Sequence, residues 1–239
     1  MDKINDWLWL DCEEVGSTND EAKTLTSRAN GAKYVVTAKR QSNGRGRRGR
    51  SWIGLDGNLF MSMALEVELK DMGQMVFLVS LSLLETLRRL FPEIDICLKW
   101  PNDVLVNDCK ISGILLEKGE GDYLVIGMGV NIVASPKIEG IIYPTRSLKD
   151  SGFATDRLSL LKAYMQTFDE NYRQWRQQGF EDIRSRWLKD AKNLGKEILV
   201  HMNNGDKTGI FTGVDGNGTL LLQCGEKIEK IYAGDIFYL

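Results

Sequence analysis

A glycine- and arginine-rich segment at residues 44–50, with the sequence GRGRRGR, is the first feature that could do chemistry. Six basic residues and no acidic residue lie between Lys39 and Arg50, although the net charge of the whole chain is −2. Glycines in such a loop let backbone amides face a bound anion, and guanidinium groups match carboxylate and phosphate oxygens. The segment therefore predicts an anion site, although a solvated basic loop or an RNA-binding stretch would have the same composition.

Further motifs in the middle of the chain place polar groups at the ends of apolar strands. The corner KWPND at 99–103 presents Lys, Asn and Asp beyond a strand, although these side chains could equally cap a turn. Lys110 opens an apolar strand in which Gly113 indicates close approach of a ligand or another backbone, a surface cation at a hairpin tip being the alternative. In GMGVN at 127–131, two glycines clear one face of a strand, and Asn131 could read a purine edge, unless the glycines form a bulge.

The elements that must position these motifs are strands with interspersed helices. Alternation of apolar and polar residues predicts strands, and a period near 3.6 predicts helices. Thr18 and Glu21 have the spacing of a capping box, which would begin the first helix. By these criteria strands are expected at 7–15, 34–40, 58–67, 95–99, 103–106, 111–117 and 123–132. Helical segments are expected at 19–28, 73–91 and 157–191, the last as a pair of helices.

The carboxyl-terminal part of the chain has a different character. Short strands are expected at 198–200, 209–214 and 220–223, separated by the tight turns NNG and DGNG. The order of elements predicts an α+β fold in two parts. Residues 1–193 would form a mixed β-sheet catalytic domain with flanking helices, and residues 194–239 a small SH3-like β-barrel.

Composition and charge exclude several classes of protein. The 239 residues are 43% hydrophobic and 27% charged, which is typical of a folded globular protein. The four cysteines share no CxxC spacing and the amino terminus has no signal peptide, so a reduced cytoplasmic protein is expected. The apolar segment 75–84 is too short to span a bilayer. His201 is the single histidine, so a catalytic triad or a His-rich metal site has little support.

The motifs, taken in their order, resemble those of the biotin–protein ligases. The resemblance is strong from Gly16 to Ile132 and covers the remaining chain in general layout. It implies an enzyme that joins biotin and ATP to give biotinyl-5′-AMP and pyrophosphate, with Mg²⁺ on the phosphates and unassigned metal-binding carboxylates. It also implies transfer of biotin to one lysine of a biotin carboxyl-carrier protein. The matching motifs are Ser17-Thr18-Asn19, Gln41 with GRGRRGR, KWPND, the K-x-x-G-I-L-x-E strand at 110–117, and G-x-G-x-N at 127–131.

The same resemblance implies a role for individual residues. Lys110, Arg45 and Arg47 are the expected catalytic residues, because positive groups stabilise the charge that moves between a carboxylate and a phosphate. The expected biotin site consists of Ser17, Thr18, Asn19, Gln41, Gly44, Arg45, Gly46, Arg47, Lys110, Gly113 and Gly129. The expected nucleotide site consists of Arg47, Arg48, Trp52, Lys99, Asn102 and Asn131.

Other functions compete with this interpretation. A lipoate–protein ligase shares the fold and the adenylation chemistry, a nucleic-acid-binding module could use the Arg/Gly loop, and a pseudo-enzyme could bind biotin without transferring it. Only six residues precede the first expected strand, so the helix-turn-helix domain of the repressor-type ligases, and with it DNA binding, is not expected. Short members of the family are often dimers, which makes a homodimer the assembly to test.

Overall fold

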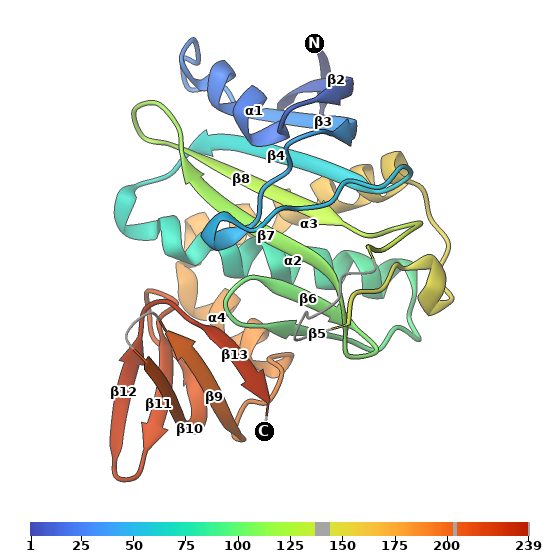
Figure 1. Ribbon diagram of the computed structural model, residues 1–239. Helices are drawn as coiled ribbons and strands as arrows, with labels where there is room; N and C mark the ends of the chain where they lie inside the picture. Colours follow the sequence, from blue (N-terminus) through green and yellow to red (C-terminus); the bar gives the residue numbers. More distant parts are fainter. Residues whose placement is uncertain (137–143, 203–204, 239) are drawn as a thin grey trace.

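The central feature of the structure, a computed structural model that describes residues 1–136, 144–202 and 205–238, is a large mixed β-sheet. Within these residues the sheet has eight strands, and the pair β2–β3 is parallel whereas the other neighbours are antiparallel (Figure 1). The order across the sheet is β1 (Asp2–Ile4), β2 (Trp7–Val15), β3 (Tyr34–Gln41), β4 (Leu59–Glu66), β8 (Tyr123–Val130), β7 (Cys109–Lys118), β6 (Asp103–Val106) and β5 (Ile96–Lys99).

Helices cover both faces of the large sheet, because successive side chains of a strand point to opposite sides. On one face, α2 (Met75–Leu90) and α3 (Arg157–Gln178) pack over the main core, which includes Val35 of β3. On the other face, α1 (Thr18–Thr26) packs against the next residue of that strand, Val36. Short 3₁₀ helices lie in the connections, at Arg47–Gly49, Leu69–Gln74 and Lys149–Ser151.

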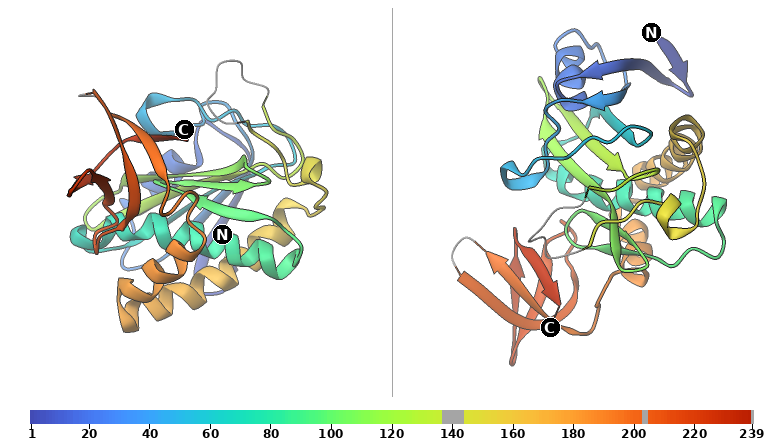
Figure 2. Two further views of the ribbon diagram at one scale, coloured as in Figure 1. Left: turned by 90° about the horizontal axis from the view of Figure 1, so that it is seen from below. Right: turned by 45° about the vertical axis from the view of Figure 1, so that its right-hand side comes forward.

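A second, antiparallel sheet forms the carboxyl-terminal module and follows helix α4 (Phe180–Lys189) (Figure 2). Its turn at 215–219 docks onto the larger domain, where the Trp100 indole donates to the carbonyl of Gly218 at 3.1 Å. Phe77 of α2 packs so closely that a Cβ added at Gly218 would lie 2.3 Å from its ring. In the described residues its strand order is β12 (Lys227–Ile231), β11 (Leu220–Cys224), β10 (Gly205–Val214), β9 (Glu197–Met202) and β13 (Asp235–Tyr238).

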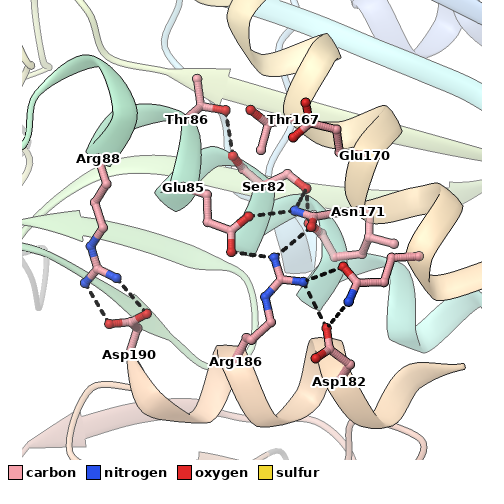
Figure 3. A network of polar contacts seen from close by, with 12 residues as sticks. Ser82, Glu85, Thr86, Arg88, Thr167, Glu170, Asn171, Asp182, Arg186 and Asp190 are labelled. Atoms are coloured by element: carbon pink, nitrogen blue, oxygen red, sulfur yellow. Dashed lines mark hydrogen bonds and ion pairs between the residues drawn. The ribbon is translucent and has the colours of Figure 1, made fainter. Parts of the chain in front are cut away.

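A polar network joins α2, α3 and α4 beneath the large sheet (Figure 3). Arg186 of α4 donates to Glu85 of α2 at 2.5 Å and to Asn171 of α3 at 2.7 Å. Asn171 is buried and also donates to Glu85 at 2.9 Å, so each helix contributes to one connected cluster. Arg88 and Asp190 form a second, bidentate ion pair between α2 and the end of α4. These bonds fix the base from which the carboxyl-terminal module extends.

The predicted α+β fold, with a small carboxyl-terminal β-domain, is confirmed, while the division at residue 193 stays a prediction. The predicted helical segment 157–191 is two helices that meet at Gly179, whose φ is +80°. The strands β1, β12 and β13 were not predicted, because all three are short and β1 and β12 are rich in charged residues. In the described part of the chain, no helix is both long and apolar enough to cross a membrane.

The capping-box prediction for the first helix is wrong. Ser17 occupies the N-cap position, and no side-chain hydrogen bond caps the helix there. The hydroxyl of Thr18 instead lies 3.0 Å from Gln41 Oε1, on the neighbouring strand β3. The side chain of Thr18 therefore makes a tertiary hydrogen bond instead of the local cap that the sequence pattern predicted.

Candidate active site

A cavity of about 360 Å³ lies beside the amino end of α1, between the loop that follows β3 and strands β7 and β8. The predicted site residues line this cavity, with the exceptions of Gly44 and Arg48. Residues separated by more than a hundred positions in the sequence, such as Thr18 and Asn131, thus share one site. The KWPND corner contributes Lys99, Asn102 and also Asp103.

One side of the cavity is lined by Ser17, Thr18, Asn19 and Gln41, and the buried Ser62 hydrogen-bonds to two of them. We call these five residues the neutral wall. The backbone N–H of Thr18 donates to Gln41 Oε1 at 2.7 Å, which fixes the orientation of that amide. Ser62 is fully buried on β4, and its hydroxyl lies 2.6 Å from Asn19 Oδ1 and 2.7 Å from Thr18 Oγ1. An amide oxygen can only accept, so Ser62 donates to Asn19 and holds the side chain in place.

Glu117 connects the neutral wall to the charged residues of the site. Asn19 Nδ2 donates to Glu117 Oε2 at 2.6 Å, and the same carboxylate contacts Lys23 at 3.0 Å and Arg45 at 3.5 Å. Partial burial would raise the pKa of Glu117, but the Asn19 and Lys23 hydrogen bonds and the Lys23 and Arg45 charges hold the pKa below its ordinary value. Glu117 closes the K-x-x-G-I-L-x-E motif, yet sequence reasoning gave it no role.

The opposite side of the cavity is the charged loop, residues 44–52. Arg45 forms a bidentate ion pair with Asp20, with distances of 2.6 and 2.8 Å. This hydrogen bonding raises the pKa of Arg45 and lowers the pKa of Asp20. A substrate anion that takes Arg45 must therefore compete with a carboxylate of the protein itself.

Arg47 differs from its neighbours because its hydrogen-bond partner is neutral. Its Nη1 donates to Asn102 Oδ1 at 3.1 Å, and among the described residues no carboxylate lies within ion-pair distance of it. Burial lowers the pKa of Arg47 from its ordinary value, which is the sign of a poorly solvated cation. Arg48, predicted to bind nucleotide, is not among the residues that line the cavity and pairs with Asp235 at 3.0 Å, and its role stays a prediction.

Two lysines meet one carboxylate at the KWPND corner. Lys110 Nζ lies 2.6 Å from Asp103 Oδ1, at the start of β7. Lys99 is only 5% exposed, and burial lowers its pKa to about 8, against the opposing influence of Asp103. At this corner the cavity is therefore lined by two lysines and the carboxylate of Asp103.

Trp52 lies inside the cavity, packed on glycines of β7 and β8. A Cβ added at Gly129 would lie 2.3 Å from the indole, and one at Gly113 would lie 3.1 Å from it. Lys110 Nζ is 5.7 Å from the ring centroid, and the buried indole N–H has no hydrogen-bond partner among the described residues. The space that the glycines create beside the expected ligand is thus shared with Trp52 in this structure.

Asn58 is a further residue that sequence reasoning missed. It is fully buried, and its Oδ1 accepts from the backbone N–H groups of Ile132, Val133 and Ala134 at 2.9 to 3.3 Å. These residues directly follow Asn131, so Asn58 holds the segment that carries the predicted adenine contact. Its signal in the sequence is an asparagine directly before the alternating β4 strand, a pattern shared with many turns.

Comparisons with known proteins agree with this geometry. Residues 13–131 match the biotin/lipoate A/B protein ligase family, and residues 194–239 match the biotin protein ligase C-terminal domain. The chain is 33% identical to a biotin–[acetyl-CoA-carboxylase] ligase of Paracoccus denitrificans, across 93% of this chain and 97% of that protein. It is 32% identical to the ligase of the same name from Mycobacterium tuberculosis, across 98% and 90% of the two chains.

A solved structure shows the same arrangement of elements. The biotin protein ligase from Aquifex aeolicus, in complex with biotin and ATP, superposes with a TM-score of 0.81 at 29% identity. The superposition covers 97% of each chain, so it includes both the large sheet and the carboxyl-terminal module. Because the chain is related to the Paracoccus denitrificans enzyme over nearly the whole length of both proteins, it belongs to the biotin protein ligase family.

Proposed function

We propose that this chain activates biotin with ATP to biotinyl-5′-AMP and transfers the biotinyl group to a lysine of a biotin carboxyl-carrier protein. The observation that carries the proposal is the pairing of the neutral wall with Arg47 and Lys110 in one cavity. A neutral wall suits the ureido ring of biotin, which has hydrogen-bonding groups and no charge. The cations suit the two anions that must react, a carboxylate and the α-phosphate.

The first step places a carboxylate oxygen of biotin on the α-phosphorus and breaks the bond to the pyrophosphate. Lys110 and Arg47 both line the cavity, and in this proposal they reduce the repulsion between these anions and stabilise the charge that develops on the phosphoryl oxygens. In the second step a lysine amine of the carrier attacks the acyl carbon, AMP leaves, and the amine loses a proton. The substrates supply both nucleophiles, which fits a site without a histidine.

Mg²⁺ belongs to this proposal as a companion of ATP. Among the described lining residues the carboxylates are Asp103 and Asp235, and each is paired with a cation. Such a site would fit a Mg²⁺ ion held mainly by the phosphates and by water, to which the carboxylate of Asp103 could contribute. The ion would neutralise phosphate charge.

The proposal also includes a cytoplasmic location, function without DNA binding and a homodimeric assembly. Light scattering tests the homodimer.

The decisive experiment incubates the enzyme with ATP, Mg²⁺, an apo carrier domain and either labelled biotin or labelled lipoate. We expect label from biotin on the carrier and biotinyl-AMP in the absence of carrier. Label from lipoate alone would assign the chain to the lipoate ligases, and adenylate without transfer would make it a pseudo-enzyme. Neither product, together with retention of RNA on a filter, would support the nucleic-acid-binding alternative.

A further inference from the structure

Asp235 is a residue of the carboxyl-terminal module that reaches the charged loop of the active site. It is the first residue of β13, whose start lies on the side of the module facing the large sheet (Figure 1). Its carboxylate accepts from Arg48 at 3.0 Å and from Arg50 at 3.0 and 3.1 Å. Asp235 also lines the cavity itself, so this ion-pair cluster belongs to the wall of the site.

The ion pairs coincide with an unfavourable backbone conformation in the loop. Arg48 has φ +56° and ψ +35°, the left-handed region that a residue with a Cβ rarely adopts, and Gly49 follows with φ +72°. The N–H of Gly46 closes this turn by donating to the carbonyl of Arg50 at 2.6 Å. The turn sends the side chains of Arg48 and Arg50 to Asp235 and leaves Arg47 directed at Asn102.

The electrostatic environment favours the ionised form of Asp235. Partial burial would raise the pKa of Asp235, but the charges of Arg50, Arg48 and Arg47 outweigh burial and hold the pKa below its ordinary value. The module that carries it is anchored separately, through the Trp100–Gly218 hydrogen bond and the packing of Phe77. Asp235 is therefore a fixed anion toward which the loop is drawn.

We propose that Asp235 is a positioning residue for adenylation: it ties the outer arginines, Arg48 and Arg50, to the carboxyl-terminal module, so that Arg47 faces the reacting groups. This inference rests on the proposed function and assigns the module a part in the active site. A second explanation is that Asp235 binds the Mg²⁺ of ATP. A third is that Asp235 and the arginines form a solvated ion pair that has no effect on the reaction. The three possibilities predict different behaviour of Asp235→Asn and Arg50→Gln.

The first test measures the loop directly and needs no activity. Trypsin cleavage after Arg47, Arg48 or Arg50 is followed in the ligand-free full-length protein. We expect Asp235→Asn to be cleaved about tenfold faster than wild type, because the loop loses its charged anchor. Glu229→Gln is the matched control, since it removes a carboxylate of the same module that pairs with Lys207 and does not touch the loop. Equal cleavage of Asp235→Asn and wild type would overturn the proposal.

The second test separates positioning from metal binding in the adenylation assay. We expect Asp235→Asn and Arg50→Gln each to raise the KM for ATP about tenfold with kcat within about threefold of wild type. The double variant should be no worse than either single one, and Asp235→Glu should recover most of the affinity. A shift in the Mg²⁺ activation curve with Asp235→Asn, while Arg50→Gln behaves as wild type, would overturn positioning in favour of metal binding.

Failure of this inference can be told apart from failure of the proposed function. If wild type makes no biotinyl-AMP, the proposed function fails, yet the cleavage rates still decide whether Asp235 anchors the loop. If wild type makes biotinyl-AMP and Asp235→Asn has the same KM and the same cleavage rate, only the inference fails. Thermal unfolding of each variant checks that folding is retained, and Arg50→Gln tests the pair from the other side if Asp235→Asn is unstable.

Discussion

The two sides of the cavity are built from different interactions. On the neutral wall, Ser62, Thr18 and Asn19 are buried and hydrogen-bond to one another and to Gln41. On the charged loop, Arg45 and Arg48 are partly exposed and pair with carboxylates of the protein. The neutral wall is thus preorganised. At the charged loop, an anion must replace carboxylates of the protein as the partner of the arginines, so the free energy of binding is a difference between two sets of ion pairs and depends on the salt concentration.

Within the charged side, Arg47 is the exception to ion pairing, because its side chain donates to the neutral amide of Asn102. Lys110 is paired with Asp103, next to the buried Lys99. Arg47 and Lys110 carry the strongest expectations, because both line the cavity and can bind a substrate phosphate. The predictions below test whether the neutral wall governs biotin binding and the charged side governs the reaction.

The largest effect is expected for Lys110→Ala. The change removes a cation from the reacting anions, and we expect adenylation to slow by at least ~10²-fold. Biotin affinity should fall much less, because the neutral wall is intact. Pyrophosphate release and biotin binding are measured separately, with Lys118→Ala, exposed at the far end of the same strand, as the matched control. Pyrophosphate release at the wild-type rate would remove Lys110 from the mechanism.

Arg47→Ala should release the intermediate rather than prevent its formation. A charge-assisted hydrogen bond to the adenylate phosphate contributes about 1.5–3 kcal/mol, so dissociation should quicken by about one to two orders of magnitude. Free biotinyl-AMP acylates exposed lysines, and we therefore expect biotin on albumin added to the reaction. A biotin blot compares this variant with wild type and with Arg40→Ala, an exposed arginine paired with Glu14. If albumin is labelled equally in all three, Arg47 does not retain the adenylate.

Ser62→Ala should affect the neutral wall alone. It leaves the buried oxygen of Asn19 without its donor, at a cost of about 1–3 kcal/mol, which corresponds to about tenfold weaker biotin binding. The KM for ATP should not change, since Ser62 does not reach the charged loop. Calorimetry with biotin and initial rates against ATP provide the two readings, and Thr24→Ala on the exposed side of α1 is the control. A larger change in the KM for ATP than in biotin affinity would contradict the idea that the neutral wall governs biotin binding alone.

Sequence patterns predicted those parts of the site that lie within one motif. Thr18, Gln41 and Lys110 could be named because their motifs resemble those of the biotin–protein ligases, and the structure places all three in one cavity, while their roles stay predictions. Ser62 could not, because its role depends on strand register: β4 pairs with β8 so that Ser62 lies opposite Gly127, beside Asn19. Asp235 could not either, since its contact with the loop depends on how the carboxyl-terminal module docks.

The failed capping box teaches the same lesson at short range. The spacing of Thr18 and Glu21 favoured a local hydrogen bond, yet the hydroxyl of Thr18 meets Gln41 and Ser62. Local pattern energies are small, about 1 kcal/mol for a cap, and a buried tertiary network outweighs them. Functional sites are the places where a structure is expected to depart from local sequence preferences.

The smallest effect is expected from pH, acting through Lys99. Burial lowers the pKa of Lys99 to about 8, so it is a cation below that pH and becomes neutral as the pH rises through it. Lys110, Arg50, Asp103 and Asp235 are the charged groups that act on it. A neutral Lys99 attracts phosphate less, and we expect the KM for ATP to rise about three- to fivefold between pH 7 and pH 9, because Asp103 already offsets part of the charge. The KM for biotin should stay flat over this range, since the neutral wall has no group that titrates there.

Initial rates against each substrate, measured for wild type and for Lys99→Met, distinguish the two sides: the variant should show the weaker ATP binding at pH 7 and lose the pH dependence. A rise in the KM for ATP that persists in Lys99→Met would mean that another group titrates, and Lys99 would then be a packing residue of the corner.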